Sequence, residues 1–572
     1  MDALERHDLK IIPERFEKTY STWLSGIQDW CISRQLWWGH RIPVWYVHDD
    51  AAAAAAATAD GGKGASPRYI VAHDEAEAQS LARAAHGPNV ALVQESDVLD
   101  TWFSSALWPF STLGWPETTP RLEKFYPTHV METGHDILFF WVARMVMMGL
   151  KFTGKLPFRC GFASACLVAL SDSARALRST VFLHGLVRDE KGRKMSKSLG
   201  NVVDPLDVVD AQGADALRFT LATGTTPGQD LNMSAEKLAS NRNLTNKLWN
   251  AGKLVLLSLD ALTDADRAAL ADARFDTPAA LAQLSLAERW IVSRLHALID
   301  RVHVSHERYD FGDAGRSVAE FIWAELADWY LEASKTRLYS DDKEAAATTR
   351  AVLLYVLDRT LRLAHPFLPY VTEELWQALP HRGPALIAAR APAAGAPVDE
   401  AAVSSFEVLR SAVRAVRNAR AEYNVEPARR VPAIFVVADA TLRGALAQEV
   451  AVLVALARLQ PGTVSFEAEV PATMAASPDD VVTLLVTDGV QVLLPVAGLA
   501  DPAKEVARLS KQAAKLQTEL DAVNARLSAP SFADKAPPAV VNKTRDSAAQ
   551  LTQQLAAVEA KAAAMRKLLE AQ

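Results

Sequence analysis

Cysteine is scarce in this sequence: among 572 residues only Cys31, Cys160 and Cys166 occur. An odd number of cysteines without a CxxC pair excludes a disulfide framework and a cysteine-based zinc site of the usual spacing. We therefore expect a protein of a reducing compartment that carries no structural metal.

Long apolar runs are also absent. The longest, residues 137–150, is interrupted by Arg144 and is too short to span a bilayer, so it predicts a buried helix. The first ten residues are acidic and polar, without the apolar core of a signal peptide or the pattern of a transit peptide. We expect no membrane association. The protein is then either cytoplasmic or has its true N-terminus upstream, where an organellar transit peptide would be carried.

The chain lacks the excess of positive charge that is typical of nucleic-acid-binding proteins, because its formal net charge is −7. An acidic total still permits local basic patches. Half of the residues are apolar and 23% are charged, which is ordinary for a soluble globular protein. The length is too great for a single core and predicts three or four domains.

Residues 1–240 predict an α/β domain. Residues 128–133 and 181–188 have strand character, and between them lies an apolar helix at residues 136–150. Strand, helix and strand in this order predict part of a parallel sheet of Rossmann type. Asp204 and Pro205 then fit the N-cap and first turn of another helix.

Two segments of this domain have unusual composition. Residues 14–48 are rich in tryptophan and arginine, which predicts a packed aromatic core with a few polar anchors. Residues 51–66 are a polyalanine run followed by GGKG. They offer no side chains able to build a core, so we expect a solvent-exposed insertion.

The rest of the chain predicts a helical domain, a small mixed region and a coiled coil. Residues 241–395 carry long amphipathic segments that suit a helical bundle and end in a linker rich in proline and alanine, and residues 396–500 predict a small α+β region. In residues 501–572, apolar residues recur at alternating spacings of three and four on both sides of a proline-containing break. This pattern predicts an antiparallel coiled-coil hairpin.

The stretch with the clearest chemistry is GRKMSKSLGN at residues 192–201. Lysines and serines between glycines are often only solvated surface. Here, however, the loop follows a predicted strand and precedes a helix N-terminus, a position suited to gripping polyphosphate. Lysine ammonium groups can stabilise the charge that develops on a pyrophosphate leaving group.

This stretch resembles the KMSKS signature of class I aminoacyl-tRNA synthetases. The resemblance implies that Lys197 contacts ATP in the transition state, while Lys194 and Ser196 support the loop. It also places His184 and Gly185, at the end of the preceding strand, near the adenine. The implied substrates include ATP with its Mg²⁺.

Residues 131–141, METGHDILFFW, resemble the valyl branch of this family and lack the Arg-Gly-Trp-Phe pattern of the isoleucyl branch. The resemblance implies that Gly134 and Asp136 bind ATP, with the Asp136 carboxylate on the ribose hydroxyls. It further implies an apolar valine pocket, lined by Trp102, Ile137 and Trp141. Indole walls can exclude isoleucine by size but cannot strongly reject threonine, which is nearly isosteric with valine.

Further resemblance covers nearly the whole chain, including residues 29–43 after the family's editing insertion and residues 328–332 and 365–369 of its anticodon-binding bundle. The terminal hairpin resembles the tRNA-contacting coiled coil of the valyl branch. It holds 11 Lys/Arg against 8 Asp/Glu, a net charge of +3 that suits phosphate contact. The implied partners are tRNA(Val), valine and ATP, and we expect a monomer.

The sequence departs from the family at three places. The HIGH-type motif does not occur before KMSKS, so we expect that this chain alone cannot activate valine at a useful rate. Residues 160–179 form an unusual insertion before the KMSKS strand. The polyalanine run stands where some relatives carry cysteine zinc ligands, so we expect no bound zinc.

Two alternatives to a valine–tRNA ligase activity remain open from the residues. One is a non-catalytic tRNA-binding or assembly protein derived from the C-terminal half of a synthetase. The other is an isoleucyl enzyme, which the valyl-like pocket strand and the coiled coil disfavour.

Overall fold

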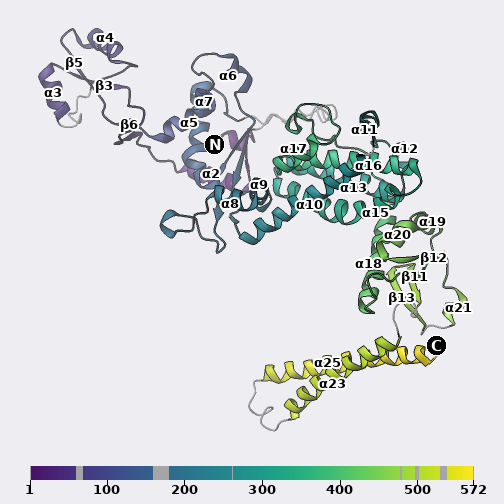
Figure 1. Cartoon of the computed structure of the whole chain (residues 1–572). Helices are drawn as coiled ribbons and strands as arrows, with labels where there is room; N and C mark the ends of the chain where they lie inside the picture. Colours follow the sequence, from purple (N-terminus) through teal and green to yellow (C-terminus); the bar gives the residue numbers. More distant parts are fainter. Residues whose placement is uncertain are drawn as a thin grey trace. The chain divides into compact units, whose positions relative to one another are not determined.

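The structure, a computed structural model, describes residues 2–59, 68–158, 179–260, 262–476, 480–495, 502–528 and 538–570. The chain divides into two units, and Figure 1 labels their helices and strands. Unit 1 comprises Met1–Gln212, Phe219–Leu238 and Ser305–Asp313, and unit 2 comprises Gly213–Arg218, Ala239–Val304 and Ala314–Gln572. The insertion expected at residues 160–179 lies, apart from its last residue, outside the described residues.

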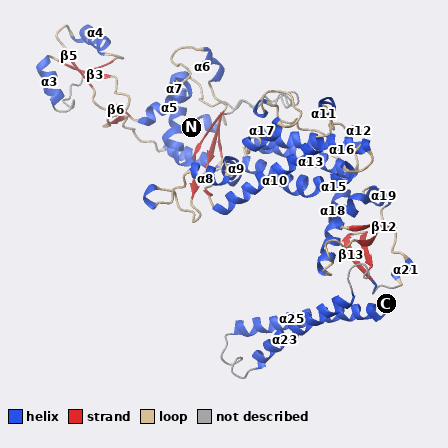
Figure 2. Ribbon diagram, in the orientation of Figure 1, coloured by secondary structure: helices blue, strands red, loops and turns tan. Residues whose placement is uncertain are grey.

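Unit 1 is built on a three-stranded parallel sheet (Figure 2). The strands lie in the order β1 (Leu9–Ile12), β8 (Ser179–His184) and β7 (Val130–Gly134). The second strand predicted from sequence, at residues 181–188, is divided into β8 and β9 (Val187–Arg188), and β9 pairs in parallel with β10 (Leu231–Asn232). The prediction of a parallel sheet is confirmed.

A mixed helix follows β7 and covers the sheet. It starts as a 3-10 turn (His135–Ile137), continues as a π-helix (Leu138–Val142) and ends as α7 (Ala143–Thr153). One face packs with residues of β1, β8 and α2 (Arg15–Ser25) in the core of the unit. On the other face Phe140, Met147 and Leu150 are 45–49% exposed. The prediction of a buried helix is therefore right for one face only, since the second face is open.

The polyalanine run is not the wholly solvent-exposed insertion that its composition predicted. Residues Ala51–Ala59 form helix α3, because alanine has the highest helix propensity, and the Asp50 carboxylate accepts a hydrogen bond from the Ala53 N–H at 2.8 Å. Ala54 and Ala57 are buried, while most of the other alanines are exposed.

A small antiparallel sheet lies beside α3 in the order β4 (Tyr69–Val71), β3 (Val44–His48) and β5 (Ala91–Gln94), with α4 (Glu75–His86) packed on it. The aromatic core expected over residues 14–48 is only partly present. Trp45 is buried, whereas Trp37 and Trp38 are 95% and 87% exposed. Aromatic density alone did not distinguish a core from a surface loop.

The other elements of unit 1 are α1 (Asp2–Glu5), β2 (Ser33–Arg34), β6 (Val98–Leu99), α5 (Thr101–Ser111), α6 (Pro120–Phe125), a 3-10 turn at Lys197–Leu199, and α8 (Pro205–Gln212). The predicted cap of α8 is confirmed, because the Asp204 carboxylate accepts a hydrogen bond from the Leu206 N–H at 2.8 Å.

Unit 2 is mainly helical, as the amphipathic periodicity predicted (Figure 2). Helices α9 (Ala214–Gly224) and α10 (Ala235–Leu259) each have residues in both units. The helices that follow are α11 (Asp264–Ala271), α12 (Pro278–Ala282), α13 (Leu286–Glu307), α14 (Phe311–Glu320), a π-helix (Phe321–Tyr330), α15 (Leu331–Leu338), α16 (Lys343–Ala364), α17 (Pro369–Gln377) and a 3-10 turn (Leu386–Ala388). Trp290 and Trp376 are completely buried in their core.

The small α+β region of unit 2 begins with α18 (Glu400–Glu422) and contains a four-stranded mixed sheet. Its strands lie in the order β12 (Leu459–Glu467), β11 (Val431–Val437), β14 (Val490–Pro495) and β13 (Val481–Thr487). The short helices of this region are α19 (Ala440–Gln448), α20 (Val450–Ala457) and α21 (Ala472–Ala475).

The C-terminal hairpin consists of α23 (Pro502–Ser528) and α25 (Pro538–Glu570), which pack against each other. The Arg566 guanidinium donates to the Ser510 hydroxyl at 3.3 Å, so the end of α25 meets the start of α23 and the pair is antiparallel. The buried positions belong to the seam expected from the spacing of three and four: Leu509, Leu520, Val541, Leu555 and Ala562. The coiled-coil prediction is confirmed.

Candidate active site

The carboxyl edge of the parallel sheet brings together four of the expected site residues. Gly134 ends β7 directly beside His184, which ends β8. A Cβ atom on Gly134 would lie 2.8 Å from the Asp136 carboxylate and 3.6 Å from the His184 ring. Gly185 is the next residue after His184. Ligands of parallel α/β sheets bind at this edge, because the loops beyond the strands leave a crevice there.

The His184 ring is oriented by two neighbours. Its Nδ1 lies 2.8 Å from the Gly185 carbonyl oxygen, to which it donates a hydrogen bond. Its Nε2 lies 3.3 Å from the Glu132 carboxylate, a contact that becomes an ion pair when the ring is protonated. Glu132 was not predicted as a site residue, although it lies in β7. The alternation of side chains along one strand does not tell which strand pairs with it, so the contact with His184 on β8 could not be foreseen.

Gly185 must be glycine for a packing reason. A Cβ atom there would lie 1.7 Å from the carbonyl oxygen of Gln229, so only hydrogen can face that backbone. With the Gly185 and Gln229 backbones this close, Asp230, the residue after Gln229, accepts a hydrogen bond from the Leu186 N–H at 2.8 Å.

Asp230 links the segment between β8 and β9 to the carboxyl edge of the sheet. Besides the Leu186 amide it binds the Arg188 guanidinium, and its Oδ1 lies 3.4 Å from His135 Nε2. The hydrogen bond from the Leu186 amide is the largest cause that lowers its pKa to about 2, and Arg188 adds to it. The sequence reasoning missed Asp230, and no local signal distinguishes it from a solvated surface carboxylate.

The KMSKS loop is organised by Asp189 at its start. One carboxylate oxygen accepts the backbone N–H groups of Lys191 and Arg193, at 3.0 and 2.8 Å. The other oxygen accepts the Asn201 amide at 3.0 Å and the Arg193 guanidinium at 2.8 Å. The hydrogen bond from Asn201 is the largest cause that lowers the pKa of Asp189 to about 2. Asp189 and Asn201 therefore close the loop at both ends.

Within the loop, Ser196 forms two hydrogen bonds that fix the backbone. Its hydroxyl accepts the Leu199 N–H at 3.3 Å and so caps the 3-10 turn Lys197–Leu199, while its own N–H donates to the Asn201 side chain at 2.9 Å. Gly200 ends the turn with a left-handed φ of 62°. The shape of the loop is thus fixed by hydrogen bonds that involve neither lysine ammonium group.

Lys194 and Lys197 are exposed. Among the residues that the structure describes, neither ammonium group has a hydrogen-bond or ion-pair partner, and no such contact joins either lysine to the sheet edge. A lysine that is held on a shaped loop without a protein partner is available to a phosphate oxygen.

The expected apolar pocket residues lie where α5 packs on the π-helix. The Trp102 ring stacks on Phe140 with centroids 5.7 Å apart, and the Trp141 indole N–H donates to the Ser105 carbonyl oxygen at 2.9 Å. Both tryptophans are half-buried, as is Ile137, which ends the 3-10 turn before the π-helix. Trp102 of α5 and Trp141 of the π-helix therefore both lie at the contact between these two helices.

A buried carboxylate supports this helix pair. Asp100 is 5% exposed and caps α5 by accepting the Trp102 N–H at 2.9 Å. It also accepts the Trp30 indole N–H at 3.0 Å and pairs with the Arg34 guanidinium. Asp100 was not among the residues singled out from the sequence. Its position before an apolar helix is the signal of an N-cap, but the partners 66 and 70 residues away are not visible in sequence.

Metal and membrane features are limited in the described part of the chain. No group of three or more His, Cys, Asp or Glu side chains there is placed to hold a metal ion. The absence of zinc stays a prediction. No single described helix is long and apolar enough to cross a membrane, although the bent pair α19 and α20 passes that test jointly by length and composition.

Three families match successive parts of the chain. Residues 1–234 match the family described as "tRNA synthetases class I (I, L, M and V)". Residues 288–435 match "Anticodon-binding domain of tRNA ligase", and residues 501–566 match "Valyl tRNA synthetase tRNA binding arm". The last match favours the valyl over the isoleucyl branch.

Curated relatives agree along nearly the full chain. The valine–tRNA ligase "chloroplastic/mitochondrial 2" of Arabidopsis thaliana is 49% identical over 562 residues, which cover 98% of this chain and 54% of that protein. Valine–tRNA ligase of Geobacillus stearothermophilus is 40% identical over 568 residues, covering 99% of this chain and 57% of the relative. That of Carboxydothermus hydrogenoformans is 43% identical, covering 94% and 54%. The chain thus spans just over half the length of the curated relatives it matches.

Proposed function

This chain belongs to the valine–tRNA ligase family of class I tRNA synthetases, and we propose that it supplies the KMSKS part of the valine-activating site together with tRNA-binding parts. The observation that carries the proposal is the KMSKS loop itself. Two lysines that have no partner among the described residues lie on a loop held by Asp189 and Asn201, beyond the carboxyl edge of a parallel sheet.

The reaction has two steps. The valine carboxylate attacks the α-phosphorus of Mg-ATP, which forms valyl-adenylate and releases pyrophosphate. A ribose hydroxyl at the 3′ end of tRNA(Val) then attacks the valyl carbonyl carbon and releases AMP. In the first step, negative charge grows on the departing pyrophosphate, and Lys197 stabilises it. Lys194 adds a second positive charge, and Ser196 keeps the turn that presents Lys197.

The sheet edge serves the adenosine of ATP. The missing side chain of Gly134 leaves room beside Asp136 and His184, so a nucleoside can approach the backbone. The exposed Asp136 carboxylate accepts hydrogen bonds from the ribose hydroxyls. Gly185 and His184 line the adenine side, where the ring of His184 is held by its bond to the Gly185 carbonyl.

Trp102, Ile137 and Trp141 form the valine pocket. Fixed indole rings give the pocket a rigid wall that excludes the extra methylene of isoleucine. The stacking of Trp102 on Phe140 and the hydrogen bond from Trp141 to Ser105 hold both rings in place.

The remaining parts bind tRNA(Val). The helical domain matches an anticodon-binding family, and the hairpin carries a net charge of +3. We further propose that the protein acts as a monomer, without bound zinc. We place it in the cytoplasm, with an organelle as the alternative because one relative is named chloroplastic/mitochondrial.

A chimera tests the proposal directly. The segment of Geobacillus stearothermophilus valine–tRNA ligase that this chain matches is replaced by this chain, and valine-dependent exchange between ATP and pyrophosphate is measured. We expect exchange with valine and not with isoleucine. Lys197→Ala should lower kcat by about 10²–10³-fold, as for other groups that stabilise transition-state charge. The matched control is Lys191→Ala, which removes another exposed lysine of the same loop and should leave exchange unchanged.

Two results would contradict the proposal. One is a folded chimera that binds tRNA(Val) but exchanges nothing, which would favour the non-catalytic tRNA-binding alternative. The other is a Lys197→Ala variant as active as its parent.

A further inference from the structure

Asp230 is bound by three segments of unit 1 at once. Its Oδ1 accepts the Leu186 N–H at 2.8 Å and lies 3.4 Å from His135 Nε2, while its Oδ2 binds the Arg188 guanidinium. The side chain is only 24% exposed. Leu186 belongs to the turn after β8, His135 to the turn after β7, and Arg188 to β9 at the base of the KMSKS loop. A single carboxylate therefore joins the three segments that carry the ATP-site residues proposed above.

The contact with Leu186 fixes the turn after β8. The Leu186 carbonyl oxygen accepts the Leu231 N–H at 2.9 Å, so both backbone groups of Leu186 are bound by residues 230–231. His184 and Gly185, which line the adenine side of the proposed site, directly precede Leu186. The position of the adenine side thus depends on the segment that contains Asp230.

The pair with Arg188 extends to the KMSKS loop. The same guanidinium donates to the carbonyl oxygen of Gly192, the first residue of the loop, at 3.3 Å. The backbone of Arg188 also forms an antiparallel bridge with Lys194. Asp189 shapes the loop from within, whereas Asp230 holds the arginine that attaches the base of the loop to the sheet.

The contact with His135 involves the turn after β7. His135 lies between Gly134 and Asp136, and its ring stacks on Phe16 with centroids 5.7 Å apart. The hydrogen bond from the backbone amide, with the guanidinium pair adding to it, lowers the pKa of Asp230 to about 2. At neutral pH the carboxylate is therefore ionised and can only accept hydrogen bonds, so the His135 ring presents its Nε2–H to Asp230.

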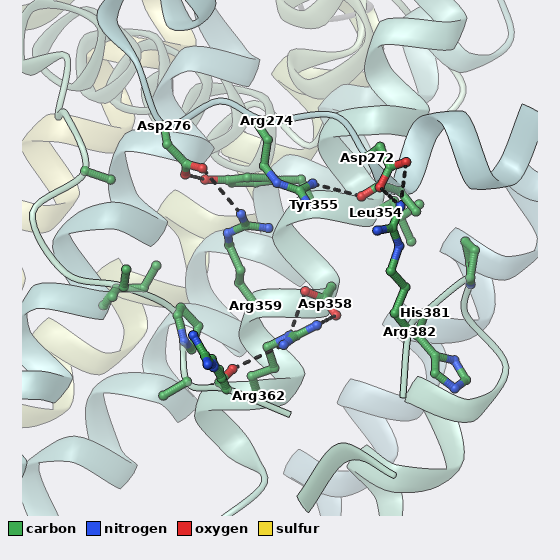
Figure 3. A pocket seen from close by; sticks show the side chains of 18 of the residues that line it. Asp272, Arg274, Asp276, Leu354, Tyr355, Asp358, Arg359, Arg362, His381 and Arg382 are labelled. Atoms are coloured by element: carbon green, nitrogen blue, oxygen red, sulfur yellow. Dashed lines mark hydrogen bonds and ion pairs between the residues drawn. The ribbon is translucent and has the colours of Figure 1, made fainter. Parts of the chain in front are cut away.

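Two arginine–aspartate pairs of unit 2 serve for comparison. Figure 3 shows them in a pocket of about 630 Å³ among the helices of that unit. Arg362 binds Asp358, which lies one turn earlier on the same helix. Arg382 donates to both oxygens of Asp272, at 2.9 and 3.0 Å, and both of these side chains are exposed. The pair of Arg382 and Asp272 has the chemistry of the pair at Asp230, but it has no contact with the KMSKS loop among the described residues.

We propose that Asp230 is a positioning residue of valine activation, which sets the KMSKS loop at the distance from the turn after β7 that lets Lys197 meet the departing pyrophosphate. The inference rests on the proposed synthetase function. Asp230 acts through Arg188 and Leu186 and not on the substrate itself. Because Lys197 is used in the transition state, its misplacement should lower kcat and leave the KM for valine nearly unchanged.

The first test introduces Asp230→Asn into the chimera described above. Asparagine keeps the size of the side chain and can accept the Leu186 N–H, but it lacks the charge that binds Arg188. We expect kcat for exchange between ATP and pyrophosphate to fall about 10²-fold, the effect of displacing a catalytic group by about 1 Å, with the KM for valine within about twofold of the parent. The matched control is Asp272→Asn, which removes an arginine–aspartate pair in unit 2 and should leave kcat unchanged.

A double-mutant cycle separates positioning from a general structural role. In a chimera that already carries Lys197→Ala, the Asp230→Asn substitution should lower kcat by no more than about threefold, because the group that Asp230 positions is absent. A purely structural role would lower kcat by the same factor in both backgrounds.

Hydrogen–deuterium exchange of the full chain provides a readout without catalysis. Asp230→Asn should speed exchange of the amides of residues 186–194 about tenfold, the effect of losing one hydrogen bond to a charged group. The amides of α7 should keep their protection, because that helix packs in the core of unit 1.

Three results would overturn the inference and leave the proposed function intact, since each is obtained with an active parent chimera. They are a kcat of Asp230→Asn equal to that of Asp272→Asn, effects of Asp230→Asn and Lys197→Ala that multiply, and a loss of protection in α7 as large as that in residues 186–194. A parent chimera without exchange would remove the proposed function and this inference together.

Discussion

Replacing Asp100 by alanine should loosen the helix that carries Trp102. In the structure one carboxylate, 5% exposed, accepts the Trp102 N–H and the Trp30 indole N–H and pairs with Arg34. Alanine removes all three interactions at once and leaves the donors of Trp30 and Arg34 without their acceptor.

The cost can be worked out from these contacts. Loss of an N-cap side chain costs about 1 kcal/mol, and a hydrogen bond from a half-buried indole contributes about 1 kcal/mol. The pair with Arg34 adds about 1 kcal/mol at most, because that side chain is 38% exposed and solvent screens it. We therefore expect about 3 kcal/mol for Asp100→Ala, with the usual variation between sites.

The assay is hydrogen–deuterium exchange of the α5 amides, since the chain folds in two units and a global unfolding curve would mix them. Asp74→Ala is the control, because Asp74 caps α4 through the Glu77 N–H at 2.8 Å and is exposed. It should cost only about 1 kcal/mol in the α4 amides. The difference of about 2 kcal/mol corresponds to an opening equilibrium about 30-fold larger for α5. Equal losses of protection in the two variants would refute the assigned roles of Trp30 and Arg34.

Three further predictions follow from single sites. Gly185→Ala should destabilise unit 1 by at least about 3 kcal/mol because its Cβ would meet the Gln229 carbonyl oxygen, whereas Gly444→Ala, whose Cβ meets nothing within 4 Å, should be neutral or stabilising by up to about 1 kcal/mol; hydrogen–deuterium exchange of the amides around each position checks this. The pKa of Asp189 is lowered from 3.8 to about 2, so the protection of amides 189–201 should be complete above pH 4 and be lost as the pH falls from 3.8 to 2; a loop already open at pH 5 would contradict the hydrogen-bond network. Leu520→Ala should reduce amide protection of the hairpin by about 2–3 kcal/mol, with the exposed Glu519→Ala as control, and equal effects would mean that the seam is not the buried face.

Features that depend on nearby residues were predictable from the sequence. The spacing of three and four determined the coiled-coil seam, because one side of a helix repeats at that interval. Likewise, Asp204 before Pro205 indicated a helix start, and the structure has that cap. The KMSKS motif identified the lysines because the residues of a loop are consecutive in the chain.

The composition of a segment was a poorer guide to its environment. The tryptophan-rich segment predicted a core, but Trp37 and Trp38 are exposed. The alanine-rich linker looked featureless, yet its backbone is fixed by His303 and Asp300. Burial is a property of what packs against a residue, and composition does not contain that information.

The sequence by itself determined the family, the parallel arrangement of strands around residues 128–188 and the identity of the two loop lysines. Only the tertiary structure decided which carboxylates hold the site together. Asp230 binds Leu186 and His135, which are 44 and 95 residues away, and Asp100 binds Trp30 across 70 residues. Such partners are chosen by the sheet and helix packing that brings distant segments within hydrogen-bonding distance, 2.8–3.4 Å in these three contacts, and no periodicity along the chain records that proximity.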